Sequence, residues 1–170
     1  KTGVRLSTAV AANHGDIGIN AVDLSYSSSA STTRGATGDS STAMGISTTA
    51  SGNASTAMGG GTTASGSVST AIGVFTTASG DNSTAMGANT TASDYGSLVI
   101  GQHNSSGSSV TNSATVFNSA NTAFVIGNGA DGNNISDAFS ILFDGSTNIA
   151  GSVTSTSFVG DGSQLTGLSG

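Results

Sequence analysis

The chain has 170 residues and a formal net charge of −6, and Ser, Thr and Gly fill 82 of its positions. Charged residues make up only 7%, against about 25% in typical soluble domains. The absence of Cys excludes disulfides and thiolate metal sites, and three basic residues are too few for nucleic-acid binding. No apolar run reaches the roughly 18 residues of a membrane span, so membrane insertion is not expected.

Residues 1–38 form the least regular part of the sequence. Ile17, Ile19 and Val22–Leu24 alternate as strand residues do, and Gly15 and Asn20 indicate turns. The pattern predicts an N-terminal β cap or connector, in which residues 25–38 are a degraded repeat. Such a cap covers the first coil of a solenoid.

Residues 39–108 carry a 14-residue repeat. Four near-identical units such as Asp81–Asp94 (DNSTAMGANTTASD) span 39–94, and a drifting fifth unit spans 95–108. Two columns of predicted turn glycines mark the period: Gly45, Gly59, Gly73, Gly87 and Gly101, and Gly52, Gly66 and Gly80. Fourteen residues fit two short strands and two tight turns, so the units predict a parallel β-solenoid with coils about 4.8 Å apart.

Alternation within the first strand of each unit separates two faces. Ala43 and its equivalents point into a coil that is too narrow for larger side chains. The other face carries two columns: Met44, Met58, Ile72, Met86 and Ile100, and Thr42, Thr56, Thr70, Thr84 and Leu98. A long apolar stripe on a thin solenoid needs cover, so these columns are expected to meet around the common axis of an obligate oligomer.

The string Ser-Thr-Ala-Met-Gly followed by Thr-Thr-Ala-Ser-Gly resembles the head repeat of YadA-like trimeric adhesins, and Ser97–Gly101 is the best match. The resemblance implies a left-handed parallel β-roll that assembles as a homotrimer on an extracellular fibre. Heads of this kind occur on bacterial surface adhesins and in phage tail fibres.

Residues 109–170 are expected to be β-rich, with a hairpin turn at Asp144-Gly145. The string from Phe158 to Leu168, with its GDGSQLTGL connector, is similar to a connector of tailed-phage, and notably marine-phage, fibre and appendage proteins. Residues 109–170 show no heptad pattern. We therefore favour a structural segment of a phage tail fibre or virion appendage involved in host attachment, with the head of a bacterial surface adhesin as the alternative. Its partners would be other fibre or virion proteins and a host-surface glycan or protein.

Catalytic, cofactor and metal sites are not expected. His14 and Asp16 lie near each other in sequence, but no nucleophile-elbow pattern surrounds a Ser. We place His103 in the column of Thr48, Thr62, Thr76 and Thr90, facing outward, with a three-His ion site around the axis as the alternative. Residues 131–134 (Asp-Gly-Asn-Asn) are interpreted as a turn, with a calcium loop as the alternative.

Regular outward threonines also suggest an ice-binding β-solenoid as a less favoured function. The threonines of each repeat are adjacent, as in Thr76 and Thr77. Only one of each pair can face outward, whereas a flat array needs Thr-x-Thr. Phe75 stands alone in its column and is either a contact point for a partner or a local core residue.

Overall fold

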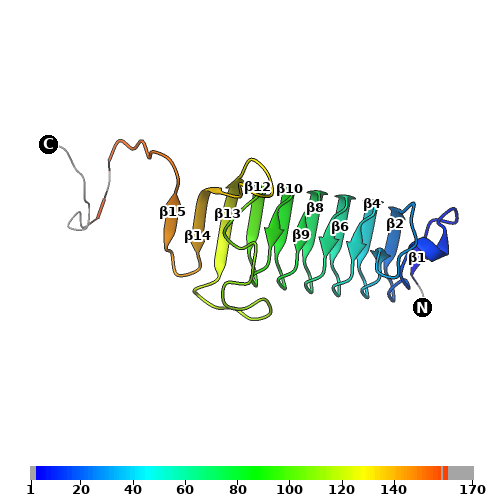
Figure 1. The fold of residues 1–170 in the computed structure, drawn as a ribbon. Helices are drawn as coiled ribbons and strands as arrows, with labels where there is room; N and C mark the ends of the chain where they lie inside the picture. The colour runs from blue at the N-terminus through cyan, green and yellow to red at the C-terminus, as the bar shows by residue number, and fades with distance from the viewer. Residues whose placement is uncertain (1–2, 158, 161–170) are drawn as a thin grey trace.

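The structure is a computed structural model that describes residues 3–157 and 159–160. These residues form an all-β solenoid of about seven turns with the predicted spacing of about 14 residues, and its strands line up in one row (Figure 1). Their one helical element is a short 3-10 turn at Ala11–Asn13. In this part of the chain no helix is long and apolar enough to cross a membrane. The predicted phage-like connector lies mainly at positions 161–168, outside the described residues.

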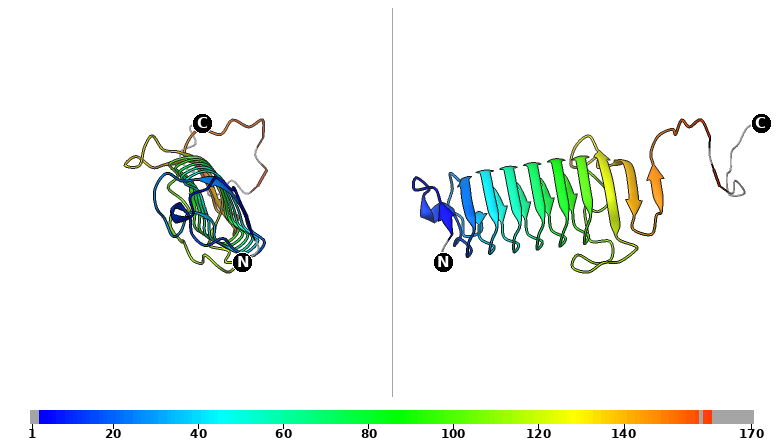
Figure 2. Two further views of the ribbon diagram at one scale, coloured as in Figure 1. Left: turned by 90° about the vertical axis from the view of Figure 1, so that its right-hand side faces the viewer. Right: turned by 180° about the vertical axis from the view of Figure 1, so that it is seen from behind.

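A ten-stranded sheet runs the length of the molecule in the order β1-β2-β4-β6-β8-β10-β12-β13-β14-β15, and neighbouring strands are parallel as far as β13. Its strands are β1 (Val4–Arg5), β2 (Val22–Tyr26), β4 (Thr42–Ile46), β6 (Thr56–Gly60), β8 (Thr70–Val74), β10 (Thr84–Ala88), β12 (Leu98–Gln102), β13 (Thr122–Asn128), β14 (Asp137–Leu142) and β15 (Thr147–Ile149). A five-stranded sheet forms the other side of the roll, which the left view of Figure 2 shows from its end. It contains β3 (Gly35–Ala36), β5 (Thr49–Ala50), β7 (Thr63–Ala64), β9 (Thr77–Ala78) and β11 (Thr91–Ala92).

Each repeat unit supplies one five-residue strand and one two-residue strand, and identical positions pair from coil to coil. Met58 of β6, for example, pairs with Met44 on one side and Ile72 on the other. The turn between units is closed by a serine that recurs in the repeat: the Ser55 hydroxyl donates to the carbonyl oxygen of Gly52 at 2.8 Å. The 14-residue period of the sequence therefore keeps neighbouring strands in the same register from coil to coil.

The core between the two sheets consists almost wholly of alanine. Two alanine columns have no exposed surface, and Val99 and Val125 continue the first of them: Ala43, Ala57, Ala71 and Ala85, and Ala50, Ala64, Ala78 and Ala92. This agrees with the prediction that the coil interior has room for little beyond a methyl group.

The two glycine columns differ in their geometry. Gly45, Gly59, Gly73, Gly87 and Gly101 were predicted as turn residues, but they lie inside β4, β6, β8, β10 and β12 with φ between +96° and +129°. Gly52, Gly66 and Gly80 lie at the start of turns. Both columns are glycine for a common reason, because a Cβ there would strike the backbone of the next coil: at Gly59 it would lie 2.0 Å from the carbonyl oxygen of Gly73.

The solenoid extends past both ends of the regular repeat. Val22 pairs with Thr42, which lies further along the chain than one repeat unit, so the predicted N-terminal cap contains a complete, longer coil built from β2 and β3. Leu98 pairs with Phe124, almost two repeat units away in sequence, so one further parallel strand follows an insertion. The predicted hairpin at Asp144-Gly145 joins β14 to β15.

Candidate subunit interface

Two columns of side chains run along the outward face of the ten-stranded sheet. Strand pairing aligns the first column as Leu24, Met44, Met58, Ile72, Met86, Ile100, Ile126, Phe139 and Ile149. The second column runs Val22, Thr42, Thr56, Thr70, Thr84, Leu98, Phe124, Ile141 and Thr147. Both columns are continuous over nine strands.

The first column is apolar at every position, yet its side chains are exposed or only half-buried in a single chain. Met44 and Met86 are each 37% exposed and Ile149 is 43% exposed, whereas the alanines on the opposite face of the same strands are completely buried. A contiguous apolar stripe of this kind on a soluble surface is typical of an interaction site. The predicted axis column therefore lies on the outside of a single chain, where a second chain can reach it.

The columns predicted from the repeat contain five of the nine positions in each column, and the other four lie outside the repeat. The missing members have the same alternating signal, in Val22-Asp23-Leu24, Phe124-Val125-Ile126 and Phe139-Ser140-Ile141. Their spacings along the chain differ from that of the repeat, which hides these segments from a search for one fixed period.

The threonines of the second sheet are arranged differently from the prediction. Thr48, Thr62, Thr76 and Thr90 were expected to face outward, but all four are completely buried beside the alanine core. Their hydroxyl oxygens have no hydrogen-bond partner. The following threonines, from Thr49 to Thr91, are half-buried on the outer side. A single outward threonine column does not provide the Thr-x-Thr array considered for ice binding.

Asn104, rather than His103, follows Thr90 in the buried threonine column. Its amide occupies the place of the next strand: Oδ1 accepts from the backbone N–H of Thr91 at 2.8 Å, and Nδ2 donates to the Thr91 carbonyl oxygen at 2.9 Å. This side chain therefore ends the second sheet at β11. His103 follows Phe75 and Asn89 in the corner column, where its backbone has φ +44°.

A buried ionic cluster lies at the N-terminal end of the roll. Asp23 occupies the alanine position of β2 and is completely buried. Arg5 Nε donates to its Oδ2 at 2.8 Å, and His14 Nδ1 lies 3.3 Å from the same oxygen. The hydroxyl of Ser25 donates to Asp23 Oδ1 at 2.6 Å. The serine is thus bound to the carboxylate, and the arrangement anchors β1 over the first coil rather than forming a nucleophilic triad.

Two further aspartates organise loops. Asp94 stands where the repeat has glycine, and its two carboxylate oxygens accept from the backbone N–H groups of Thr111 (2.6 Å) and Thr122 (2.8 Å), which orders the insertion before β13. Asp131 Oδ1 accepts from the backbone N–H groups of Asn133 and Asn134, at 2.8 and 3.0 Å.

The hydrogen bond from the Asn133 backbone, helped by the Asn134 side chain, lowers the pKa of Asp131. The loop is therefore a turn closed on itself. No group of three or more His or acidic side chains in the described part of the chain is placed to hold a metal ion.

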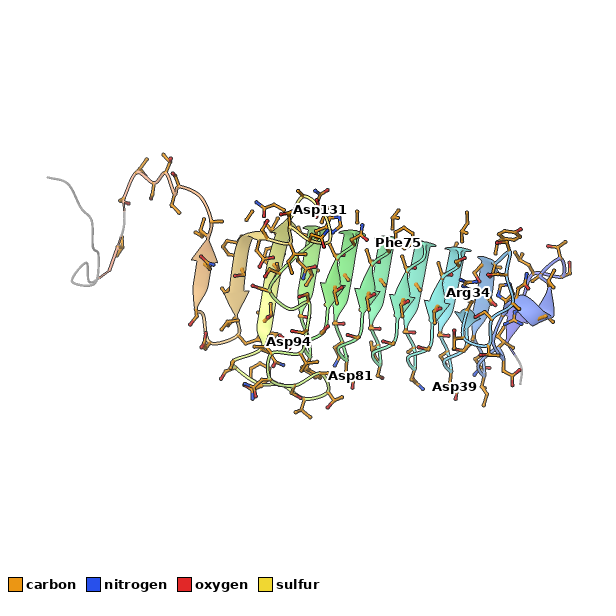
Figure 3. All side chains as sticks on the ribbon, in the orientation of Figure 1. Arg34, Asp39, Phe75, Asp81, Asp94 and Asp131 are labelled. Atoms are coloured by element: carbon orange, nitrogen blue, oxygen red, sulfur yellow. The ribbon has the colours of Figure 1, made fainter. Side chains whose placement is uncertain are left out.

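Figure 3 places Phe75 and Asp131 along one edge of the solenoid, with Asp39, Asp81 and Asp94 along the other. The Phe75 side chain is 63% exposed, and a Cβ added to Gly61 in the coil before it would lie 2.6 Å from the ring. Phe75 therefore lies next to Gly61 on the surface and is not a core residue.

The family model of the YadA head domain repeat matches this chain in four overlapping segments, at residues 36–62, 50–76, 64–90 and 78–104. No curated protein and no solved structure matches the chain. The matched segments cover the coils from β3 to β12, in which the alanine core, the glycine ladders and the first outward column are most regular. Residues 36–104 are therefore a β-roll similar to the YadA head, a surface-exposed extracellular element of trimeric adhesins.

Proposed function

We propose that this chain is a structural segment of a homotrimeric extracellular fibre that takes part in attachment to a host surface. The apolar column from Met44 to Ile100 carries this proposal. It lies open along one face of the chain, at identical positions of parallel strands. Three chains arranged around an axis parallel to the solenoid bring each residue of the column opposite its own copies, and cyclic closure removes the stripe from water.

The mechanism of such a segment is mechanical. Backbone ladders link every coil to the next, and the glycine columns let successive coils approach so closely that no Cβ fits between them. A rod of this kind resists bending because bending must open ladder hydrogen bonds on one side. Its outer surface offers many Ser, Thr and Asn side chains, together with exposed apolar and aromatic ones such as Ile46, Tyr26 and Phe75. No catalytic role is proposed.

Two biological settings fit this architecture. A virion tail fibre or appendage is favoured by the connector-like string Phe158–Leu168 and by the β-strands that continue from β13 to β15. A bacterial surface adhesin is favoured by the match to the YadA head repeat. Labelled protein applied to bacterial cells and to animal cells separates the two: binding to bacteria supports the virion setting, and binding to animal cells supports the adhesin.

The shared axis is tested by replacing Ile72 with Asp, with Thr77→Asp as the matched control in the same coil. The first variant brings a charge into a column that is desolvated in the trimer, so we expect dissociation or unfolding. The second places the same charge on the outer side of β9, where assembly should continue. Light scattering and thermal melts measure both. An Ile72→Asp protein that keeps the mass and melting curve of the parent would show that the column faces water.

A further inference from the structure

We propose that the C-terminal strands β13–β15 form a second, chain-specific part of the subunit interface, in which their apolar face packs against the same strands of the partner copies. This inference rests on the trimer proposed above. The face consists of Phe124, Ile126, Phe139, Ile141 and Ile149, and it lies outside the segments similar to the YadA head repeat.

The first observation is that the ten-stranded sheet extends beyond the end of the five-stranded sheet. The five-stranded sheet ends at β11, where the amide of Asn104 closes it. The ten-stranded sheet continues through β13, β14 and β15, which in Figure 2 stand beyond the last coil. These strands have no partner in the second sheet, although Val125 of β13 is still completely buried on the inner side.

The second observation is the polarity of the two faces of this extension. On the side that continues the alanine core, the aligned positions are Val125, Ser140 and Asn148, so the core line becomes polar and ends exposed at Asn148. The opposite side is apolar, and the rings of Phe124 and Phe139 lie 5.8 Å apart on it. An antiparallel hairpin with one apolar face needs a further layer on that face for stability.

The third observation is a change of residue type at the point where the second sheet ends. The second outward column is Val22 in the first coil and threonine in the four regular repeat units that follow, from Thr42 to Thr84. It becomes Leu98, Phe124 and Ile141 in β12, β13 and β14, and it ends at Thr147 in β15. The chain thus places larger apolar side chains on the outward face of β12, β13 and β14, where the second sheet has ended or is about to end.

The occupant of this face is a second and a third copy of the chain. The first outward column passes without a break from Met86 through Ile126 to Ile149. In a cyclic assembly equal residues lie at equal heights around the axis. A face that is continuous with the axial column must therefore meet its own copies.

Single cysteines test the inference, because the chain contains none of its own. Three full-length variants are oxidised under the same mild conditions: Ile149→Cys on the proposed face, Asn148→Cys beside it on the opposite face, and Met86→Cys in the axial column of the roll. A disulfide requires Cβ atoms about 4 Å apart, so only residues that meet at the axis can link. Only two of the three equivalent thiols in a trimer can pair with each other. The fraction of chains in disulfide-linked dimers should therefore reach a maximum of about two thirds.

We expect dimers from Ile149→Cys and Met86→Cys, and at least a fivefold smaller yield from Asn148→Cys. Linkage of Met86→Cys alone would overturn the inference while leaving the trimeric roll intact. Equal linkage of Ile149→Cys and Asn148→Cys would overturn it as well, since the contact would have no face preference. Failure of all three variants would refute the proposed trimer itself.

Discussion

Two adjacent glycines of β6 give a sharp test of how the coils are stacked. Gly59 belongs to the ladder inside the strands and has φ +122°, whereas an ideal Cβ on Gly60 meets no atom within 4 Å. Alanine at position 59 adopts a backbone conformation that costs about 1–3 kcal/mol for a residue with a Cβ. Its methyl group would also lie 2.0 Å from the carbonyl oxygen of Gly73, so the coils must separate until the contact exceeds at least 3.0 Å.

Separating the two coils also lengthens the backbone hydrogen bonds next to Gly59 and Gly73. The bond from Phe75 N–H to the Gly60 carbonyl oxygen is 2.8 Å long, and an opening of about 1 Å breaks it, at a net cost of about 1 kcal/mol. We expect Gly59→Ala to destabilise each chain by about 2–4 kcal/mol, centred on about 3 kcal/mol. Gly60→Ala should be neutral or stabilising by up to about 1 kcal/mol, because it restricts the unfolded chain.

Thermal melts at equal protein concentration compare the two variants. A difference of about 3 kcal/mol corresponds to roughly 6–12 °C for a chain of this size. Melting temperatures that agree within about 2 °C, which corresponds to less than about 1 kcal/mol, would refute the close stacking of the coils through the Gly59 column.

Two further predictions concern single side chains. Thr76→Val removes a buried hydroxyl without a hydrogen-bond partner, so we expect the free energy of unfolding in a urea melt to rise by about 1 kcal/mol. Thr76→Lys, in contrast, should prevent folding of its coil. A stable lysine variant would place this column on the surface. Hydrogen bonds from the Asn133 backbone and the Asn134 side chain lower the pKa of Asp131 below its ordinary value of 3.8, so its stabilising effect on the turn is present above pH 3.8 and is lost as the pH falls through the lowered pKa. NMR titration of this carboxyl group should give a midpoint below 3.8, and a midpoint at or above 3.8 would contradict the turn.

The regular part of the fold could be predicted because one short period determines it. A repeat unit with alternating Thr42, Ala43 and Met44 specifies the strand, its faces and its partner in the next coil. The alanine interior followed from the narrowness of such a coil.

The exceptions depend on contacts between positions that the period does not relate. Thr48 is buried although it is polar, because the second strand turns that side of the pair inward, and adjacent threonines give no alternation from which to choose. Asn104 ends the second sheet with side-chain hydrogen bonds, and Asp94 orders an insertion with its carboxylate. Neither role has a signal in composition or spacing.

The apolar column of the proposed interface could be predicted in part for a related reason. The column from Met44 to Ile100 recurs once in every repeat unit and stands out in the sequence. Its extensions at Leu24 and at Ile126 become visible only when strand pairing places them in line.

The central claim is that this open column is the axis of a trimer, and the mass of the native protein tests it most directly. Light scattering on the folded chain should give three times the monomer mass of 16.2 kDa, together with a β-rich circular dichroism spectrum. A folded protein with a mass of 16.2 kDa would contradict the shared axis, because the apolar column would then be stable in water without a partner.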